Sequence, residues 1–358
     1  MVLLIILYII ENYEIDAHGA GDCIYIGNTT VHFMVRNCKL YNASWQWYIY
    51  NEGCGITLYN VTNGRLENNT YSDCWYAIYL RDSSNNTLYS NKMQNCGIFL
   101  DGSIDTFTTQ HIATNNTVNN KPVYYYKNAN MSNLAVPSDA GEVILGNISY
   151  LIIENLNLSY GSIGIEIGYS HHITVRNCIC SNNNRYGIYL VYSNNNALIN
   201  NTCINNEYGI YLYDSDNNNI IHSLLTHNTN YAIYIDRYCS NNFIYNNSFY
   251  YNHGSGDTFN SSLIQAYDGG SNNWWNSSSG YGNYWHDWAN NNNSNDLNGD
   301  GIVDWPYPID GSAGAKDYYP LANPTVVPEI STEILWVIIT MCVLVTGIGW
   351  KYKTKFSL

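Results

Sequence analysis

Near the end of the chain, one short motif combines the residue types and the spacing that a calcium ion requires. Side-chain oxygens occupy positions 1, 3, 5 and 9 of a loop with glycine at position 6, and a main-chain carbonyl would serve at position 7, as in the front half of an EF-hand loop. The predicted ligands are Asp296, Asn298, Asp300, the carbonyl of Ile302, and Asp304. Position 12 is Tyr307 where such loops place a carboxylate, so Asp287 or Asp310 would have to complete the shell. The alternative is an Asp/Asn/Gly turn without an ion.

Copper would need a different set of ligands. Cu(I) sites favour clusters of Met and Cys, and Cu(II) sites favour imidazole. The 5 Met are scattered, and His171-His172 is the single pair of adjacent histidines. We expect these two rings to point apart, because successive side chains on a strand do so. The ligand inventory therefore favours calcium over copper.

Glycan-cleaving chemistry needs paired carboxylates, or a basic residue beside a metal-bound carboxylate cluster. The acidic residues expected on outward strand positions are few and fall on different repeats: Asp101, Glu166 and Asp236. The arginines at Arg81, Arg185 and Arg237 have no Asp cluster at matching positions. The sequence therefore leans away from an enzyme, and a polysaccharide lyase or hydrolase remains the alternative.

These residues are placed by a repeat built from two short patterns. The first is a small residue followed by an apolar-x-apolar triplet, and it begins at Gly55, Ala77, Gly97, Gly164, Gly187, Gly209 and Ala232. The second follows about ten residues later as apolar-x-Asn-Asn-x-apolar, with clear copies at Leu66–Tyr71, Leu88–Met93, Leu198–Cys203 and Ile244–Phe249. Period-2 alternation interrupted by Asn, Ser and Gly is typical of short strands separated by turns. A constant spacing lets each strand lie on its counterpart one coil away.

The predicted fold is all-β: a right-handed parallel β-helix of about ten coils of roughly 22 residues. One buried column is expected to contain Ile56, Ile78, Ile98, Val143, Ile165, Ile188, Ile210 and Ile233. The first Asn of the Asn-Asn pair should occupy a bend, where Asn tolerates a left-handed backbone and its amide can bond to the amide one coil away. This column comprises Asn37, Asn68, Ser90, Asn155, Asn177, Asn200, His222 and Asn246.

The middle residue of each triplet should point outward, and it is usually aromatic. Stacked coils would align Tyr25, Tyr79, Phe99, Tyr189, Tyr211 and Tyr234 into one exposed stripe. Aromatic faces bind sugar rings and protein surfaces, so we predict that the stripe binds carbohydrate or other surface proteins. The alternative is a ladder that only stabilises its own sheet.

Composition limits the other functions. Charged residues make up 12% of the chain and the formal net charge is −14, which argues against a nucleic-acid partner. Two cysteine pairs, Cys74 with Cys96 and Cys180 with Cys203, would share columns on adjacent coils, where either disulfides or stacked thiols fit. The density of Asn-x-Ser/Thr triplets is compatible with a secreted glycoprotein.

The ends of the chain suggest an anchored surface protein. We expect a β-helix over 1–270 with an inserted loop at 101–142, and an aromatic and Asp-rich cap over 271–324. A linker (325–333) then leads to a membrane anchor (334–350) and a basic cytoplasmic tail (351–358), because charge-free apolar residues are followed by lysines. Ile10 and Ile15 occupy repeat positions, so residues 2–15 should form coil strands rather than an export signal. We therefore expect the N-terminal export signal to be missing from this chain.

Three stretches carry a resemblance to a known family. They are the GIYL and Asn-Asn repeats, the segment NNTVNNKPVYYYKN…VPSDAGEVIL (115–145), and NYWHDW…DLNGDGIVDWPYPIDG…DYYPL (283–321). In these the chain resembles the NosD-like family of parallel β-helix repeat proteins, in particular archaeal cell-surface members. The resemblance implies an exported protein of the pectate-lyase-like superfamily, with carbohydrate-related or copper-maturation roles.

Overall fold

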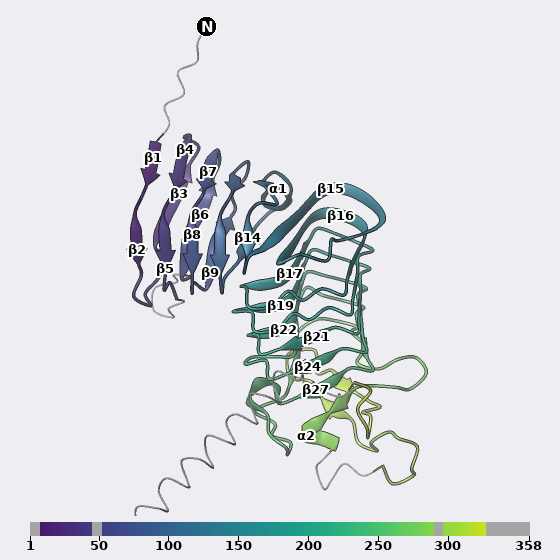
Figure 1. Cartoon of the computed structure of the whole chain (residues 1–358). Helices are drawn as coiled ribbons and strands as arrows, with labels where there is room; N and C mark the ends of the chain where they lie inside the picture. Colours follow the sequence, from purple (N-terminus) through teal and green to yellow (C-terminus); the bar gives the residue numbers. More distant parts are fainter. Residues whose placement is uncertain (1–7, 45–51, 290–295, 327–358) are drawn as a thin grey trace, which may run out of the picture. The chain divides into compact units, whose positions relative to one another are not determined.

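The computed structural model describes residues 8–44, 52–289 and 296–326. These residues form about ten coils, in which parallel β-strands lie one above another. Three very short helices complete the described part of the chain. Figure 1 shows the strands from purple at the N-terminal end to green and yellow at the C-terminal end. The predicted all-β parallel solenoid is therefore confirmed.

The first stack of coils runs from residue 8 to residue 118 and has three sheets. One sheet contains β1 (Tyr8–Glu11), β4 (Phe33–Arg36), β7 (Gly64–Glu67), β10 (Thr87–Tyr89) and β13 (His111–Ile112). The second contains β2 (Glu14–Asp16), β5 (Lys39–Tyr41), β8 (Thr70–Ser72), β11 (Lys92–Gln94) and β14 (Thr117–Val118). The third contains β3 (Ile24–Thr29), β6 (Cys54–Val61), β9 (Tyr76–Arg81) and β12 (Ile98–Asp101).

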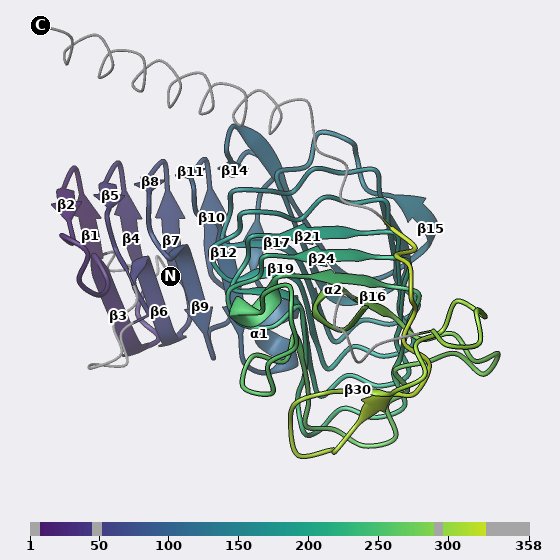
Figure 2. The same ribbon diagram turned by 90° about the horizontal axis from the view of Figure 1, so that it is seen from below.

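The second stack begins with two long strands, β15 (Lys121–Ala135) and β16 (Glu142–Glu154). One sheet continues through β17 (Ile163–Gly168), β19 (Tyr186–Val191), β22 (Tyr208–Tyr213), β25 (Ile233–Ile235) and β28 (Ala266–Asp268). A second face consists of β18 (Thr174–Arg176), β20 (Ala197–Ile199), β23 (Asn219–Ile221) and β26 (Phe243–Tyr245). The third consists of β21 (Thr202–Ile204), β24 (Leu224–Thr226), β27 (Ser248–Tyr250) and β29 (Tyr284–Trp285). Figure 2 shows β21 and β24 lying side by side.

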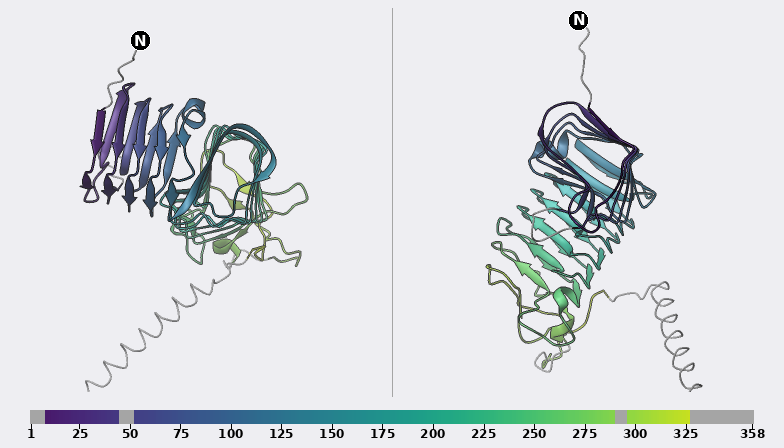
Figure 3. Two further views of the ribbon diagram at one scale, coloured as in Figure 1. Left: turned by 45° about the horizontal axis from the view of Figure 1, so that its top comes forward. Right: turned by 90° about the vertical axis from the view of Figure 1, so that its left-hand side faces the viewer.

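The remaining elements are short. Helix α1 (Ile104–Thr108) follows β12, the 3-10 helix η1 (Asn252–Gly254) follows β27, and α2 (His286–Ala289) follows β29. A two-stranded antiparallel sheet of β30 (Tyr307–Pro308) and β31 (Lys316–Asp317) lies near the end of the described chain. In the left view of Figure 3, successive coils of the second stack overlie one another.

Register confirms the repeat alignment at the start of the chain. Ile10 pairs with Val35, and Ile15 pairs with Leu40, so both isoleucines occupy coil positions. Residues 2–7 of that prediction lie outside the described range, as do the expected anchor at 334–350 and the tail at 351–358. No helix within 8–44, 52–289 and 296–326 is long and apolar enough to cross a membrane.

The expected insertion at 101–142 is instead built into the coils. It contains β13 and β14, which pair with β10 and β11, and the 15-residue strand β15, which pairs with β16. The sequence signal was missed because these strands lack the small-residue triplet. Strand β14 pairs with β15 in antiparallel fashion, and the parallel stacking of the first stack ends there.

The single predicted aliphatic column is therefore two columns. All its members are fully buried, and Ile188 pairs directly with Ile210 as predicted. The first column ends at Ile98, because β12 pairs only with β9. The second begins again at β16, where Val143 pairs with Ile165.

The open edge of β12 is closed by side chains of the second stack. The Glu142 carboxylate accepts a hydrogen bond from the Ile98 N–H at 3.0 Å, and the Glu166 carboxylate accepts one from the Leu100 N–H at 3.3 Å. The Ser162 hydroxyl accepts a third from the Gly97 N–H at 2.8 Å. An unpaired strand edge normally invites association, and here carboxylate and hydroxyl oxygens take the place of a neighbouring strand.

Asparagine ladders hold the coils together at the bends. The predicted outer column has a left-handed backbone throughout, and Asn68 and Asn200 donate to the amide oxygens of Asn37 and Asn177. The second Asn of each pair forms an inner, buried ladder, which the repeat pattern did not predict. Its members accept the main-chain N–H of the preceding coil, and they include Asn69, Asn91, Asn116, Asn201, Asn247 and Asn283.

Three inner ladders of the second stack end on buried aspartates. Asn273 donates to Asp268, Gln265 to Asp287, and the main chain of Asn283 to Asp317. Aromatic donors complete two of these carboxylates, because Trp275 binds Asp268 and Trp285 binds Asp317 through their indole N–H groups. A chain of amides that each accept and donate needs an acceptor at its last position, and a carboxylate supplies it.

Candidate ligand-binding face

Outward residues of the second stack cover one sheet with tyrosine rings. The middle residues of successive triplets pair in register in the order Glu166, Tyr189, Tyr211, Tyr234 and Tyr267. Two further columns flank them, one before the glycine of each repeat and one after the triplet. We define the tyrosine face as Tyr192, Tyr208, Tyr211, Tyr213, Tyr231, Tyr234, Tyr238 and Tyr267.

The rings on this face stack closely. Tyr211 and Tyr234 have centroids 4.6 Å apart with an interplanar angle of 14°, and Tyr234 and Tyr267 lie 4.5 Å apart at 5°. Tyr192 and Tyr213 form an edge contact at 5.7 Å in a neighbouring column. Such ring pairs contribute about 0.5–1.5 kcal/mol beyond the area that they bury. The rings are thus held rigidly by one another.

Tyr211, Tyr234 and Tyr267 are only half-buried, so part of each ring reaches the surface. Burial raises the pKa of Tyr234 to about 12, with a smaller contribution from neighbouring Tyr267. The hydroxyl groups are consequently neutral at physiological pH and can both donate and accept hydrogen bonds.

The predicted stripe is not exposed along its whole length, and this part of the prediction is wrong. Tyr79, Phe99 and Tyr189 are only 3%, 6% and 7% exposed. Phe99 packs against Tyr79 at 5.2 Å and against Tyr189 at 5.9 Å. The outward faces of the two stacks cover each other here, so residues that point away from their own coil become interior. Tyr25 is 60% exposed, but it belongs to the first stack, where its neighbour one coil on is Thr57.

The face also contains tyrosines that the stripe omitted. Tyr208, Tyr213, Tyr231, Tyr238 and Tyr267 join Tyr211 and Tyr234 on the same sheet. A signal for most of them was present, because the repeats read YGIYLVY, YGIYLYD and YAIYIDRY, with a tyrosine directly before the small residue as well as within the triplet.

Acidic groups flank the tyrosine face. Asp310 accepts a hydrogen bond from the Tyr231 hydroxyl at 2.7 Å. Asp236 accepts one from the main-chain N–H of Tyr238 at 3.2 Å. The pKa of Asp214 is raised by burial and by the negative charges of Asp216 and Asp236. The surface beside the rings is therefore rich in hydrogen-bond acceptors.

In the glycine-rich loop predicted to bind calcium, the carboxylates accept hydrogen bonds from the N–H groups of the same loop. Asp296 accepts hydrogen bonds from the N–H groups of Gly299, Asp300 and Gly301 at 2.7–3.0 Å. Asp304 accepts one from the Leu297 N–H at 2.8 Å, and Asp300 accepts one from the Ile302 N–H at 2.9 Å. These bonds form a tight turn with oxygens on its surface, and calcium binding here stays a prediction.

Within the described residues, no three His, Cys, Asp or Glu side chains are placed to share a metal ion. The prediction that His171 and His172 point apart is wrong, since their Nδ1 atoms lie 2.8 Å from each other. His172 has a φ of 57°, which breaks the strand alternation and turns both rings to one side. Two imidazoles alone do not make a complete copper site.

All nine described cysteines are free thiols, and Cys342 lies outside the described range.

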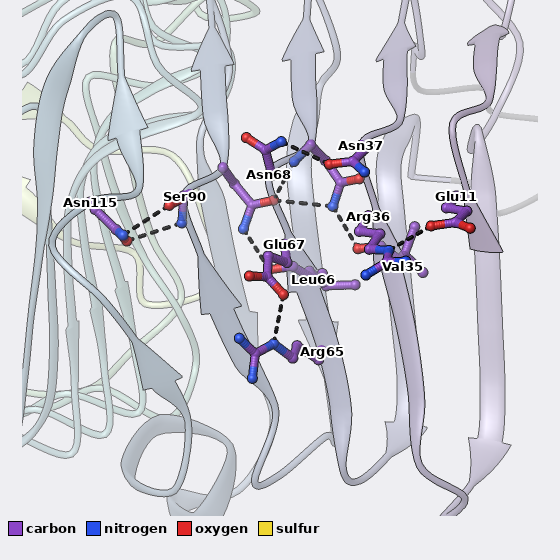
Figure 4. Close-up of polar contacts among 12 residues, drawn as sticks. Glu11, Val35, Arg36, Asn37, Arg65, Leu66, Glu67, Asn68, Ser90 and Asn115 are labelled. Carbon is purple, nitrogen blue, oxygen red and sulfur yellow. Dashed lines mark hydrogen bonds and ion pairs between the residues drawn. The ribbon is translucent and has the colours of Figure 1, made fainter. Parts of the chain in front are cut away.

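The first stack contains a polar depression, which is a second candidate site. Its volume is about 270 Å³, and it is lined by Arg36, Asn37, Glu67, Asn68 and Ser90. Figure 4 shows these side chains with their polar contacts. Its charges are already paired, because Arg36 binds Glu11 at 2.6 Å and Glu67 binds Arg65 at 2.9 Å. The second stack repeats the first of these pairs, with Arg176 2.6 Å from Glu154. The charged groups of this depression are therefore paired with one another along the side of the coil, and they are not held in place for a ligand.

Stacked parallel coils joined by asparagine ladders define a right-handed parallel β-helix protein. A profile described as "Right handed beta helix region" matches residues 8–141. A profile described as "Periplasmic copper-binding protein (NosD)" matches residues 97–290, more than half of the chain. The chain belongs to the NosD family. A comparison with curated proteins gives no match.

The comparison with solved structures matches the periplasmic alginate epimerase AlgG, at 16% identity and a TM-score of 0.26 over 68% of this chain and 54% of that one. The catalytic domain of a GH87 alpha-1,3-glucanase in complex with nigerose has 12% identity and a TM-score of 0.20, over 63% and 53%. PfbA, a surface adhesin of Streptococcus pneumoniae, has 10% identity and a TM-score of 0.23, over 64% and 64%. This chain spans little more than half the length of the first two.

Proposed function

We propose that this protein is a surface-displayed β-helix that binds glycans through its tyrosine face. The observation that carries the proposal is that Tyr211, Tyr234 and Tyr267 stack in register and yet are only partly buried. Contiguous exposed aromatic surface on a protein commonly marks an interaction site. The C–H faces of a sugar ring pack well on such rings, which are apolar on the face and polar at the hydroxyl.

The rigidity of the face supports binding. Each ring is fixed between its neighbours one coil away, and the strands beneath are paired on both sides. A ligand that docks on these rings would cost little side-chain entropy, because the rotamers are already restricted. Asp236 and Asp310 lie beside the rings as acceptors for sugar hydroxyl groups.

The proposal competes with a purely structural role, in which the tyrosines only stabilise the sheet. The two readings differ in what a single truncation does. A structural ladder predicts that Tyr234→Ala lowers the melting temperature and changes nothing else. A binding face predicts a loss of polysaccharide affinity that exceeds any change in stability.

The test is affinity electrophoresis of the purified full chain through gels that contain single polysaccharides. We expect at least one polysaccharide to retard the wild type, and we expect Tyr234→Ala and Tyr267→Ala to weaken the retardation at least tenfold. The matched control is Tyr13→Ala, since Tyr13 is 59% exposed but lies on the first stack. If every polysaccharide that retards the wild type retards all the variants equally, the tyrosine face is not the binding site.

Display at the surface is the second part of the proposal. It rests on the apolar segment 334–350 and the lysines that follow it, which favour a membrane anchor with the β-helix outside. Alkaline extraction of membranes from expressing cells tests it. The full chain should stay in the pellet, and a chain truncated after residue 326 should be released.

A further inference from the structure

The charges around the tyrosine face select among polysaccharides. We infer that the face takes an uncharged glycan and rejects polymers of uronic acids; this inference rests on the proposed glycan-binding function. It follows from the balance between the carboxylates that border the rings and the cations that remain available to a ligand.

Carboxylates border the open rings from several coils. The Asp236 carboxylate accepts the main-chain N–H of Tyr238 at 3.2 Å, and its negative charge adds to burial in raising the pKa of Tyr211, Tyr213 and Tyr234. Asp214 lies near both Asp216 and Asp236. At the other side, the Asp310 carboxylate accepts the Tyr231 hydroxyl at 2.7 Å. Glu207 lies beside Tyr208.

The two arginines nearest the face differ in availability. Arg185 is already committed: its Nη1 donates to the Tyr76 hydroxyl at 2.8 Å, and its guanidinium lies 3.7 Å from Glu52 and 3.8 Å from Glu207. Arg237 is exposed; its Nη2 donates to the Tyr238 hydroxyl at 2.7 Å and its guanidinium lies 4.7 Å from the centroid of that ring, but among the described residues it does not pair with a carboxylate as Arg185 does. Of these two arginines, Arg237 is therefore the one whose charge is open to an anionic ligand.

A uronic acid polymer carries a carboxylate on every sugar. Recognition of carboxylates normally uses arginine pairs or bound cations. Here a sugar carboxylate on the rings would approach protein carboxylates of like sign, and at physiological ionic strength charges are screened only beyond about 8 Å. A neutral sugar presents hydroxyl groups instead, and these donate hydrogen bonds to Asp236 and Asp310. The same carboxylates that repel a uronate therefore bind a neutral hexose.

The experiment compares two sets of polymers on the full chain, with EDTA present so that no calcium bridges carboxylates. The neutral set is dextran, glucomannan and laminarin, and the acidic set is alginate and polygalacturonate. We expect at least one neutral polymer to bind at least tenfold more tightly than either acidic one, in a manner lost in Tyr234→Ala.

The charge argument is tested by a double variant. Asp214→Asn with Asp236→Asn should raise affinity for the acidic polymers at least threefold and reduce their dependence on salt, while Asp73→Asn, on an exposed bend of the first stack, should not. Melting curves confirm that each variant is folded. Acidic polymers that bind as tightly as neutral ones, through Tyr234, would overturn the inference and leave the glycan-binding function standing. Binding of no polymer at all would overturn both.

Discussion

The Glu142 carboxylate lies 3.0 Å from the main-chain nitrogen of Ile98, 44 residues earlier in the chain, and it accepts that N–H as a neighbouring strand would. Both residues are almost fully buried, at 1% and 0% exposure. This contact, with the parallel one from Glu166 to Leu100, fastens the second stack to the open edge of the first. Buried carboxyl groups thus hold a junction between two sets of coils.

The junction should make stability depend on pH. Burial raises the pKa of Glu142 and of Glu166 well above the usual 4.5, and the charge of Glu142 raises that of Glu166 further. A raised folded-state pKa means that stability is fully present below the unfolded value of 4.5 and is lost as pH rises toward the folded value. The slope reaches at most about 1.4 kcal/mol per pH unit for each group.

We therefore expect Glu142→Gln to flatten the pH dependence of urea unfolding above pH 4.5, because the amide oxygen still accepts the Ile98 N–H and carries no proton to lose. Glu142→Ala should instead cost about 3 kcal/mol at acidic pH, since it leaves that buried N–H without an acceptor and opens a cavity. Identical pH profiles for wild type and Glu142→Gln would contradict this account.

The end of one inner ladder provides a second pH-dependent group. Burial raises the pKa of Asp317 to about 7, although four hydrogen-bond donors act in the opposite direction. Stability contributed by this group should decline between its unfolded pKa of 3.8 and about 7, by about 4 kcal/mol at 1.36 kcal/mol per unit. In Asp317→Asn, the melting temperature should fall less between pH 4 and 8 than it does in the wild type, because the amide does not titrate. If the melting temperature falls equally in the variant, other groups cause the decline.

Inner and outer ladders should differ in their energetic contribution. Asn228 is buried; its Oδ1 accepts the Asn206 N–H at 3.1 Å and its Nδ2 donates to Asn252 at 2.9 Å. Asn228→Ala leaves groups unsatisfied on both neighbouring coils and should cost about 3 kcal/mol. Asn200 makes one exposed bond, to Asn177, and Asn200→Gly keeps its left-handed backbone, so it should cost about 1 kcal/mol or less. Chemical denaturation of the two variants measures the difference, and equal costs would refute it.

Calcium is tested by removing it. If the loop that starts at Asp296 binds the ion, EDTA should lower the melting temperature of the wild type by several degrees, since an ion that binds only the folded state stabilises it by mass action. Asp300→Ala should melt at the EDTA value with or without the chelator. A wild-type protein whose melting temperature ignores both EDTA and added calcium would show that the loop is a turn held by its own hydrogen bonds.

Much of the coil could be predicted because it is local and periodic. The spacing of the triplets placed Ile188 against Ile210, and the Asn-Asn pairs placed Asn68 against Asn37. Both follow from strand alternation and from the tolerance of Asn for a left-handed backbone. A repeat that is stacked on itself needs only nearest-neighbour contacts, so the sequence of each coil contains the information for its packing.

Which outward residues reach the surface was decided only by the tertiary structure. Phe99 and Tyr234 occupy the same position in the repeat, and yet Phe99 is buried, at 6% exposure, whereas Tyr234 is only partly buried. Likewise, Glu166 stands where the following coils have tyrosine, and its role appears only because the edge of β12 lies against it. Repeat position fixes the side of a strand from which a side chain projects. What it meets there depends on contacts between residues far apart in the chain, for which a periodic pattern carries no signal.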